Sequence, residues 1–381
     1  MNLSAPLNIL YFGIYSKGIE YPRNNNLIRA LRLTGAKIIE AHVNLADSFN
    51  KRIHIIQSPL QALLFSLNLA FSFLILTWKF IRTPQVDIII VGHPGYFHIH
   101  LAKLLRRLFK KNALLVYDVF IPLYDTIVED RKLVKPDGIY AQFLERFEAS
   151  SCRCADICLI DTNTHRRYLS EKYGLPSKRL LRVLVGPTIG TNFDSPPIHY
   201  RKTFNVVYVG TYIPLHGVEV ILDAAKILNG KQNIHFFLVG SGQLRPEMER
   251  LAREWKLNNI TFQNWVPTQH LGEYIRSFDL SLGIFGSTAK AMRVIPSKIF
   301  DSCAVGVPFV SADTPALNEV FYHKKNAWLI PANNPEALAT AIVTLKSNVN
   351  LRRRMAEAVH QAGKSRFSME QIGIDLLKAI L

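Results

Sequence analysis

Residues 205–222, NVVYVGTYIPLHGVEVIL, contain the strand–turn–helix unit that decides the fold. The apolar run 205–209 predicts a strand, Gly210 predicts a tight turn after it, and residues 217–229 have the pattern of a helix. A continuous apolar run, without alternation, is typical of a parallel strand that helices cover on both faces. The unit therefore predicts an α/β, doubly wound sheet.

The same unit recurs along the whole chain. A stretch without apolar periodicity, GPTIGTNFDSPPIHYRKT at 186–203, separates two series of such units and holds three prolines and two glycines. It is the best candidate for a linker. Strands are predicted at 8–12, 38–41, 86–91, 114–117, 157–160 and 182–185 before it, and at 205–209, 235–239, 259–262, 280–284, 308–311 and 327–330 after it.

This arrangement predicts two tandem Rossmann-like domains. We expect an N-terminal domain over 1–190, a linker over 191–203, a second domain over 204–365, and a C-terminal helix over 366–381 that could cross back to the first domain. In open α/β sheets, ligands bind beyond the carboxyl ends of the strands. Both sheets are therefore expected to face a central cleft.

The charge of the chain concerns its partners rather than its fold. The 381 residues carry a formal net charge of +17, which suits nucleic acid, an anionic lipid surface or a phosphorylated small molecule. The chain has no helix-turn-helix, RNA-recognition or zinc-finger pattern, so nucleic acid is not expected.

The cysteines and the N-terminus indicate the compartment. Three of the four cysteines, Cys152, Cys154 and Cys158, lie too close together for a disulfide framework and favour a reducing environment. The first residues lack the pattern of a secretory signal, so we expect a cytoplasmic protein. A metal site at these cysteines would need His165 as its fourth ligand, and no metal is expected.

Two segments predict contact with an anionic membrane surface. Residues 59–81, PLQALLFSLNLAFSFLILTWKFI, favour a helix in the membrane interface, with Trp78, Lys79 and Arg82 near the headgroups. A buried helix and a membrane-spanning helix are the alternatives. Residues 101–111 combine leucines at helical spacing with five Lys or Arg residues, which predicts a basic amphipathic helix, or otherwise an ordinary solvated face. Together with the net charge, these segments place the protein on the inner face of the membrane.

Glycines end several of the predicted strands. Gly13, Gly210 and Gly240 each follow an apolar run. A glycine there lets the backbone approach a ligand, and the N-terminus of the next helix can accept the charge of a phosphate. A tight strand-to-helix turn without a ligand is the alternative for each.

The segment 284–310, IFGSTAKAMRVIPSKIFDSCAVGVPFV, carries the most specific pattern in the chain. Pro296 can begin a helix, which places Lys298 in its first turn and Asp301 one turn later on roughly the same face. A lysine suits a phosphate, and a carboxylate accepts two neighbouring hydroxyls. The segment therefore predicts a nucleoside-diphosphate site, with a plain Lys–Asp surface pair as the alternative.

These motifs resemble the family 4 glycosyltransferases, which are retaining enzymes of the GT-B fold. The resemblance covers about 205–360, through VGTYIPLHGVEVILDAAKIL, FLVGSGQL, FQNWVP, FGSTAKAMRVIPSKIFDSCAVGVPFV and NAWLIPANNPEALATAI. The first half resembles a subset of the family through IIIVGHPG, YDVFIPLYDTIVEDR and LIDTNTH.

The resemblance implies a donor site in the second half and catalytic groups in the first. Asp301 matches the glutamate that holds the ribose hydroxyls, and Lys298 approaches the diphosphate. The backbone at Trp265 and Val266 faces the base. Gly210 and His216 match the loop near the phosphates, Gly13 and Gly240 join the donor-binding set, and Asp118 and His93 lie on the catalytic side, towards the sugar and acceptor.

The chain departs from the family at the first glutamate of its motif, where Arg293 stands. The family's Arg and Lys for the diphosphate are replaced by Thr211 or Tyr212 and by His216. Phosphate binding would then depend on Lys298 and Arg293. No DxD motif is present, which agrees with a family that needs no metal.

The function that the resemblance implies is that of a glycosyltransferase of the hexosyltransferase type. It would move a sugar from a nucleoside-diphosphate donor to a lipid, a lipid-linked glycan or a polysaccharide, with retention. A nucleotide-sugar epimerase of the same architecture and a non-catalytic binding module are the alternatives.

Overall fold

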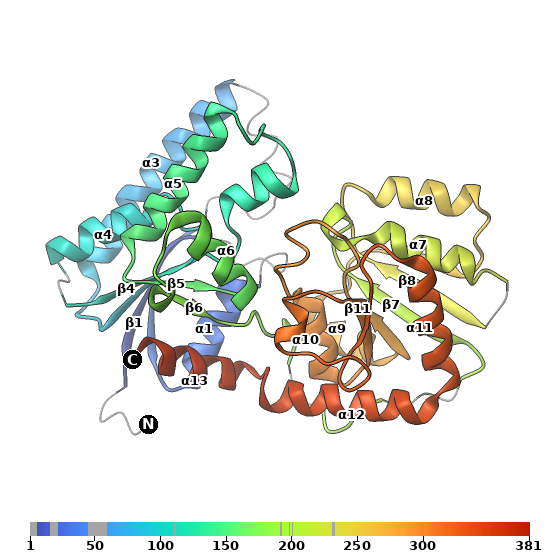
Figure 1. Cartoon of the computed structure of the whole chain (residues 1–381). Coiled ribbons are helices and arrows are strands. Elements are labelled where there is room, and N and C mark those ends of the chain that lie inside the picture. The colour runs from blue at the N-terminus through green and yellow to red at the C-terminus, as the bar shows by residue number, and fades with distance from the viewer. Residues whose placement is uncertain are drawn as a thin grey trace. The chain divides into compact units, whose positions relative to one another are not determined.

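The structure is a computed structural model that describes residues 6–15, 22–44, 59–109, 112–190, 193–197, 199, 201–230 and 233–381. It divides the chain into two compact units, Met1–Leu184 with Met369–Leu381 (unit 1) and Val185–Ser368 (unit 2). Figure 1 colours the chain by residue number, so the C-terminal segment of unit 1 is dark red. The boundary at Val185 precedes the segment 191–203 that the sequence favours as the linker.

Unit 1 is built on a six-stranded parallel sheet of order β2-β1-β3-β4-β5-β6. Its strands are β1 (Asn8–Ile14), β2 (Lys37–Val43), β3 (Ile88–Val91), β4 (Leu114–Asp118), β5 (Ile157–Ile160) and β6 (Leu180–Arg182). Its helices are α1 (Arg23–Leu33), α3 (Pro59–Arg82), α4 (His98–Phe109), η1 (Asp125–Asp130, a short π-helix), α5 (Ile139–Cys154), α6 (Asn163–Tyr173), η2 (Ser177–Arg179) and α13 (Met369–Ile380).

Alternate residues of each strand in unit 1 enter two separate cores. Ile89 and Val91 of β3 pack with α3, α4, α5 and α6, whereas Ile88 and Ile90 pack with α1 and α13. Gly373 of α13 lies against α1, where an added Cβ would come within 2.3 Å of the Ala30 carbonyl oxygen. Helices therefore cover both faces of the sheet, as the continuous apolar strands predict.

The sixth strand ends earlier than predicted. The sequence places it at 182–185, but β6 ends at Arg182. The carbonyl oxygens of Val183 and Leu184 accept hydrogen bonds from the Arg23 guanidinium, at 2.8 and 3.2 Å, and not from a neighbouring strand.

Unit 2 has the same architecture, with strand order β12-β11-β10-β7-β8-β9. Its strands are β7 (Phe204–Val209), β8 (Ile234–Val239), β9 (Ile260–Gln263), β10 (Leu280–Leu282), β11 (Phe309–Ala312) and β12 (Trp328–Ile330). Its helices are η3 (Pro214–His216), α7 (Val218–Ile227), α8 (Arg245–Glu254), α9 (Thr268–Arg276), α10 (Ser297–Val305), η4 (Leu317–Glu319), α11 (Pro335–Ser347) and α12 (Val349–Ser365). The predicted α/β class with two Rossmann-like units is confirmed.

The segment 59–81 forms most of α3. Trp78 and Arg82 lie on its surface, with the guanidinium 4.2 Å from the indole ring centroid. Lys79 differs from the expectation, because its ammonium donates to the His42 carbonyl within unit 1. No helix among the described residues is long and apolar enough to cross a bilayer.

A buried histidine makes unit 1 sensitive to acid. His98 is buried against Gly13, and burial lowers its pKa from the ordinary value to about 4, although a hydrogen bond with the Gly92 backbone opposes this. The unfolded chain takes up this proton near pH 6.5 and the folded chain only near pH 4, so stability is lost as pH falls through that window.

We expect the free energy of unfolding to fall by about 3 kcal/mol between pH 7 and pH 4 through His98 alone. Urea unfolding of wild type and His98→Gln across this range isolates the effect, since other groups titrate equally in both proteins. Parallel pH profiles for the two proteins would contradict the assignment.

Candidate functional site

The predicted glycine turns of unit 2 meet at the carboxyl edge of its sheet. Gly210 follows β7 and Gly240 follows β8. A Cβ at Gly240 would lie 2.1 Å from the Gly210 carbonyl oxygen, and one at Gly210 would lie 2.3 Å from Lys298 Nζ. Any side chain at these two positions would fill the space that Lys298 occupies or push the two turns apart.

Lys298 supplies a buried cation at this edge. It is 8% exposed, and its Nζ has no hydrogen-bond partner among the described residues. The ammonium lies 3.9 Å from the ring centroid of Tyr208. Burial lowers the pKa of Lys298 well below its usual range, because it disfavours the charged ammonium.

The first turn of α10, which contains Lys298, is also suited to binding an anion. Lys298 is the second residue of α10, and no side chain caps this end among the described residues. The free N–H groups of a helix start carry partial positive charge and bind anions. A lysine ammonium and a helix N-terminus are both groups that suit a phosphate.

His216 and Tyr208 place polar side-chain atoms beside Lys298. The Tyr208 hydroxyl donates to the Thr211 carbonyl at 2.8 Å and lies 2.8 Å from His216 Nδ1. Burial, with the nearby Lys298 charge, lowers the pKa of His216 well below its ordinary value, although the Thr211 carbonyl opposes this. The Tyr208 hydroxyl and the His216 ring thus line the space beside Lys298.

Trp265 offers an exposed ring next to Gly240. It is 45% exposed, and its indole Nε1 donates to Ser241 Oγ at 3.1 Å. The ring lies 3.4 Å from where a Gly240 Cβ would stand. Val266, by contrast, packs into the apolar clusters beneath. An exposed aromatic face beside a phosphate site suits stacking against a base.

Asp301 holds a loop of its own unit. Its carboxylate accepts hydrogen bonds from the Thr188 N–H at 2.6 Å and the Thr188 hydroxyl at 2.9 Å. Burial raises the pKa of Asp301 to about 6, although these hydrogen bonds lower it. The carboxylate that we expect at the ribose hydroxyls is therefore engaged with the 186–190 segment. Arg293 lies in the turn before α10, where its N–H donates to the Lys290 carbonyl.

Gly13, His93 and Asp118 belong to unit 1. Asp118 ends β4, is fully buried, and forms a two-pronged ion pair with Arg23 of α1 (Nη2–Oδ1 2.9 Å, Nε–Oδ2 3.0 Å). Burial raises the pKa of Asp118, which the charge and hydrogen bonds of Arg23 partly offset. The carboxylate thus holds Arg23 and does not face an open space.

His93 supports the chain that follows β4. Its Nδ1 lies 3.1 Å from the Val119 carbonyl oxygen, and its ring packs edge-on against Phe120. Phe120 has a φ of 47°, a left-handed conformation that is rare outside glycine and persists where neighbours enforce it.

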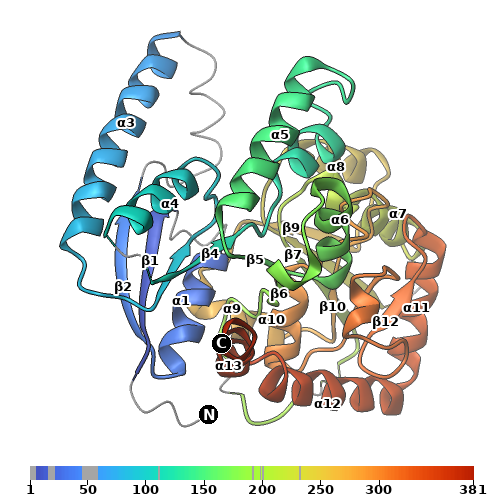
Figure 2. The same cartoon turned by 60° about the vertical axis from the view of Figure 1, so that its left-hand side comes forward.

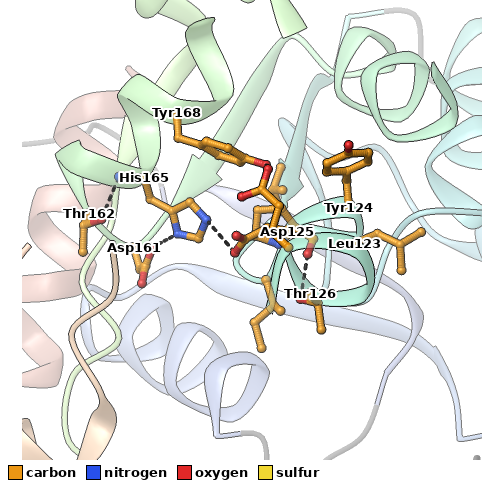
Figure 3. A network of polar contacts seen from close by, with 12 residues as sticks. Leu123, Tyr124, Asp125, Thr126, Asp161, Thr162, His165 and Tyr168 are labelled. Atoms are coloured by element: carbon orange, nitrogen blue, oxygen red, sulfur yellow. Dashed lines mark hydrogen bonds and ion pairs between the residues drawn. The ribbon is translucent and has the colours of Figure 1, made fainter. Parts of the chain in front are cut away.

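Sequence reasoning missed a buried network in unit 1, drawn in Figure 3. His165 Nδ1 lies 2.9 Å from Asp161 Oδ1, and His165 Nε2 lies 3.7 Å from Asp125 Oδ2. The sequence considered His165 only as a metal ligand beside the cysteines, whereas its ring faces two carboxylates. The signal was present in LIDTNTH and YDVFIPLYDTIVEDR, which carry these residues in the segments that follow two predicted strands.

The fold and this geometry define the class of protein. The chain aligns with a crystal structure of Anabaena Alr3699/HepE in complex with UDP-glucose, with a TM-score of 0.71 and 14% identity over 98% of this chain and 99% of that chain. The chain therefore has the GT-B fold. This likeness concerns the fold, since the identity is low.

The family follows from the second unit. Residues 203–348 match the family model of the group 1 glycosyl transferases, so this region is a group 1 glycosyl transferase domain and the resemblance to family 4 is confirmed.

The curated relatives have low sequence identity to this chain, and each is longer than the part that aligns with it. The α-D-kanosaminyltransferase of Streptomyces kanamyceticus is 25% identical over 57% of this chain and 49% of its own length. The O-antigen chain mannosyltransferase C of Escherichia coli is 22% identical over 66% of each chain. The chain spans about half the length of the first curated relatives it matches.

Proposed function

We propose that this chain is a glycosyltransferase that moves a sugar from a nucleoside-diphosphate donor to a lipid or lipid-linked glycan, with retention at the anomeric carbon. The observation that carries the proposal is Lys298, a buried ammonium without an anionic partner among the described residues, at the open N-terminus of α10. A buried charge of this kind is costly unless a ligand completes it.

The proposed reaction uses this charge at the leaving group. As the bond from the anomeric carbon to the diphosphate breaks, negative charge grows on the phosphate oxygens. Lys298 and the first N–H groups of α10 stabilise that charge. The acceptor hydroxyl attacks on the face that the diphosphate leaves and passes its proton to the departing oxygen. These steps require no metal, so we propose a metal-independent donor site.

We propose that other groups at the carboxyl edge of the unit 2 sheet bind the remaining parts of the donor. We propose that Trp265 stacks on the base. We propose that Asp301 binds the ribose, either with its remaining lone pairs or through the backbone segment that it holds. Gly210 and Gly240 let the backbone approach the diphosphate, and Arg293 adds charge to it. In unit 1, His93 acts on the acceptor side through the chain after β4, which it contacts, and Asp118 acts through Arg23, which it holds.

The acceptor side is proposed to rest on an anionic membrane surface, on the inner face of the membrane. In unit 1, α4 packs between α3 and α5, as Figure 2 shows, and the three helices share one layer over the sheet. Large apolar side chains are exposed along it, at Leu67, Phe71, Leu74, Trp78, Ile81, Phe97, Leu104, Leu108, Phe109, Ile139, Tyr140 and Phe143. Lys103 and Arg107 lie exposed among them, while Lys110 and Lys111 fall outside the described residues. Apolar and basic groups together suit anionic lipid.

We expect the double variant Phe71→Ser/Trp78→Ser to lower binding to phosphatidylglycerol-containing vesicles at least tenfold, because both rings are more than half exposed and would enter the lipid interface. Co-sedimentation measures the bound fraction. Tyr322→Ser, which removes a 55% exposed ring from unit 2, is the matched control and should leave binding unchanged. Wild-type binding that is absent, or equal in the double variant, would contradict the membrane proposal.

Product analysis tests the reaction itself. The purified protein is incubated with UDP-, GDP-, dTDP- and ADP-sugars, with and without a lipid extract of the producing cells. A glycosyltransferase yields a glycosylated lipid only when the extract is present. An altered nucleotide sugar without extract would instead show an epimerase, and an unchanged donor under both conditions would leave a binding module.

A further inference from the structure

We infer that the buried side chains Asp161, His165 and Asp125 act together as a positioning device for the acceptor side of the enzyme. This inference rests on the proposed function and names the residues that set its acceptor geometry. We call these three side chains the aspartate–histidine network.

The network is closed to solvent. His165 and Asp125 are 0% exposed, and Asp161 is 2% exposed. Asp161 directly follows β5, and His165 lies in the first turn of α6, where its N–H donates to the capping Thr162 hydroxyl at 3.0 Å. The imidazole is therefore fixed from the β5–α6 side by both its backbone and Asp161.

The third member comes from a different element. Asp125 opens η1, and its carboxylate faces His165 Nε2 at 3.7 Å, beyond hydrogen-bond length. A neutral imidazole that donates from Nδ1 to Asp161 turns a lone pair towards Asp125. A proton on both ring nitrogens makes both contacts attractive. The network thus ties η1 to α6 electrostatically.

The segment 119–124, which precedes Asp125, is also held by side chains from other elements. Buried Glu148 of α5 accepts the N–H groups of Leu123 at 2.6 Å and Tyr124 at 2.8 Å. The Tyr96 hydroxyl donates to the Ile121 carbonyl, and His93 contacts Val119. With Asp125 at its end, the 119–124 segment is held along its length by polar side chains from other elements.

This segment follows Asp118 at the carboxyl edge of the sheet, where ligands bind in such folds. Stability alone does not require a buried charged network there, since apolar replacements of similar volume are often neutral or stabilising. Holding a strained segment in one position is what substrate placement requires. His165 is thus a positioning residue, because it acts through Asp125.

The test compares Asp125→Asn, which keeps the shape and removes the charge, with wild type. Transfer is measured from the donor found by product analysis, at rising concentrations of the lipid extract. Hydrolysis of the donor by water and nucleotide binding are measured alongside. We expect the half-saturating extract concentration to rise at least tenfold in Asp125→Asn, with donor hydrolysis and nucleotide affinity unchanged, because the donor site lies in unit 2.

The matched control is Asp156→Asn at the opposite, amino end of β5. Asp156 accepts the Leu115 N–H at 2.9 Å and pairs with Arg106. Its loss should lower thermal stability and leave the half-saturating concentration unchanged. The variant Asp125→Asn/His165→Gln should be no worse than the more impaired single variant, because coupled residues are not additive.

His165→Gln, which removes the imidazole that lies between Asp161 and Asp125, is the second variant should Asp125→Asn not fold. The inference would be overturned if the folded variant reached half-saturation at the wild-type extract concentration. A parallel loss of transfer, donor hydrolysis and nucleotide binding would also overturn it. A wild-type protein that transfers no sugar would instead overturn the proposed function, and the inference with it.

Discussion

Replacing Lys298 by methionine is expected to lower the affinity for the donor's nucleoside diphosphate about a hundredfold, because truncating one partner of a buried charge pair costs roughly 2–5 kcal/mol. The same change should leave the unliganded protein equally or more stable. Methionine fills the space beside Tyr208 without a buried, uncompensated charge, whereas burial opposes the charged lysine in the empty site. Calorimetric titration measures the affinity, and thermal unfolding measures the stability.

The opposite signs of these two effects distinguish a ligand site from a structural contact. Lys226→Met is the matched control, because Lys226 lies over the Trp255 ring at the same 3.9 Å but on an exposed surface of α7. It should change neither quantity appreciably. A Lys298→Met protein with wild-type nucleotide affinity, or with reduced unliganded stability, would show that Lys298 serves the fold and not the donor.

Replacing Arg23 by methionine is expected to destabilise unit 1 by about 3–5 kcal/mol, because it leaves the Asp118 carboxylate buried without its partner. The carbonyl oxygens of Val183 and Leu184 also lose their donor. Urea unfolding measures the change. The double variant Arg23→Met/Asp118→Leu should recover much of the loss, since it removes the orphaned charge.

Arg32→Met on the same helix provides the comparison. Arg32 pairs with Glu40 at 2.8 Å, nearly the length of the Arg23–Asp118 pair, but its side chain is 56% exposed. Exposed pairs contribute about 0–1 kcal/mol, so this variant should be nearly neutral. Equal destabilisation by the two variants would show that burial does not set the contribution of the Arg23 pair.

Local patterns in the sequence predicted the parts of the molecule that depend on local geometry. The run before Gly210 forms β7, and the Pro296 signal places Lys298 in the first turn of α10. These features depend on residues close together in the chain. The glycine turns at Gly210 and Gly240 could be predicted because each follows a recognisable apolar run.

Contacts between distant segments could not be predicted in the same way. Arg23 lies 95 positions before Asp118, and the sequence offered no reason to pair them. The aspartate–histidine network joins elements that are neighbours only in the folded sheet. Lys79, whose pattern placed it at lipid headgroups, instead satisfies the His42 carbonyl. In each case the partner is distant in the chain, so a single sequence does not reveal the contact.

Binding of a nucleoside diphosphate at the Lys298 edge is tested most directly by thermal unfolding of the wild-type protein with UDP, GDP, dTDP, ADP and CMP in turn. A ligand that binds only the folded state stabilises it by about 2.7 kcal/mol at a hundred times its dissociation constant. We predict a selective rise in unfolding temperature with one diphosphate, which Asp301→Ala and Lys298→Met both diminish. Identical unfolding temperatures with every nucleotide at millimolar concentration would contradict the donor site in unit 2.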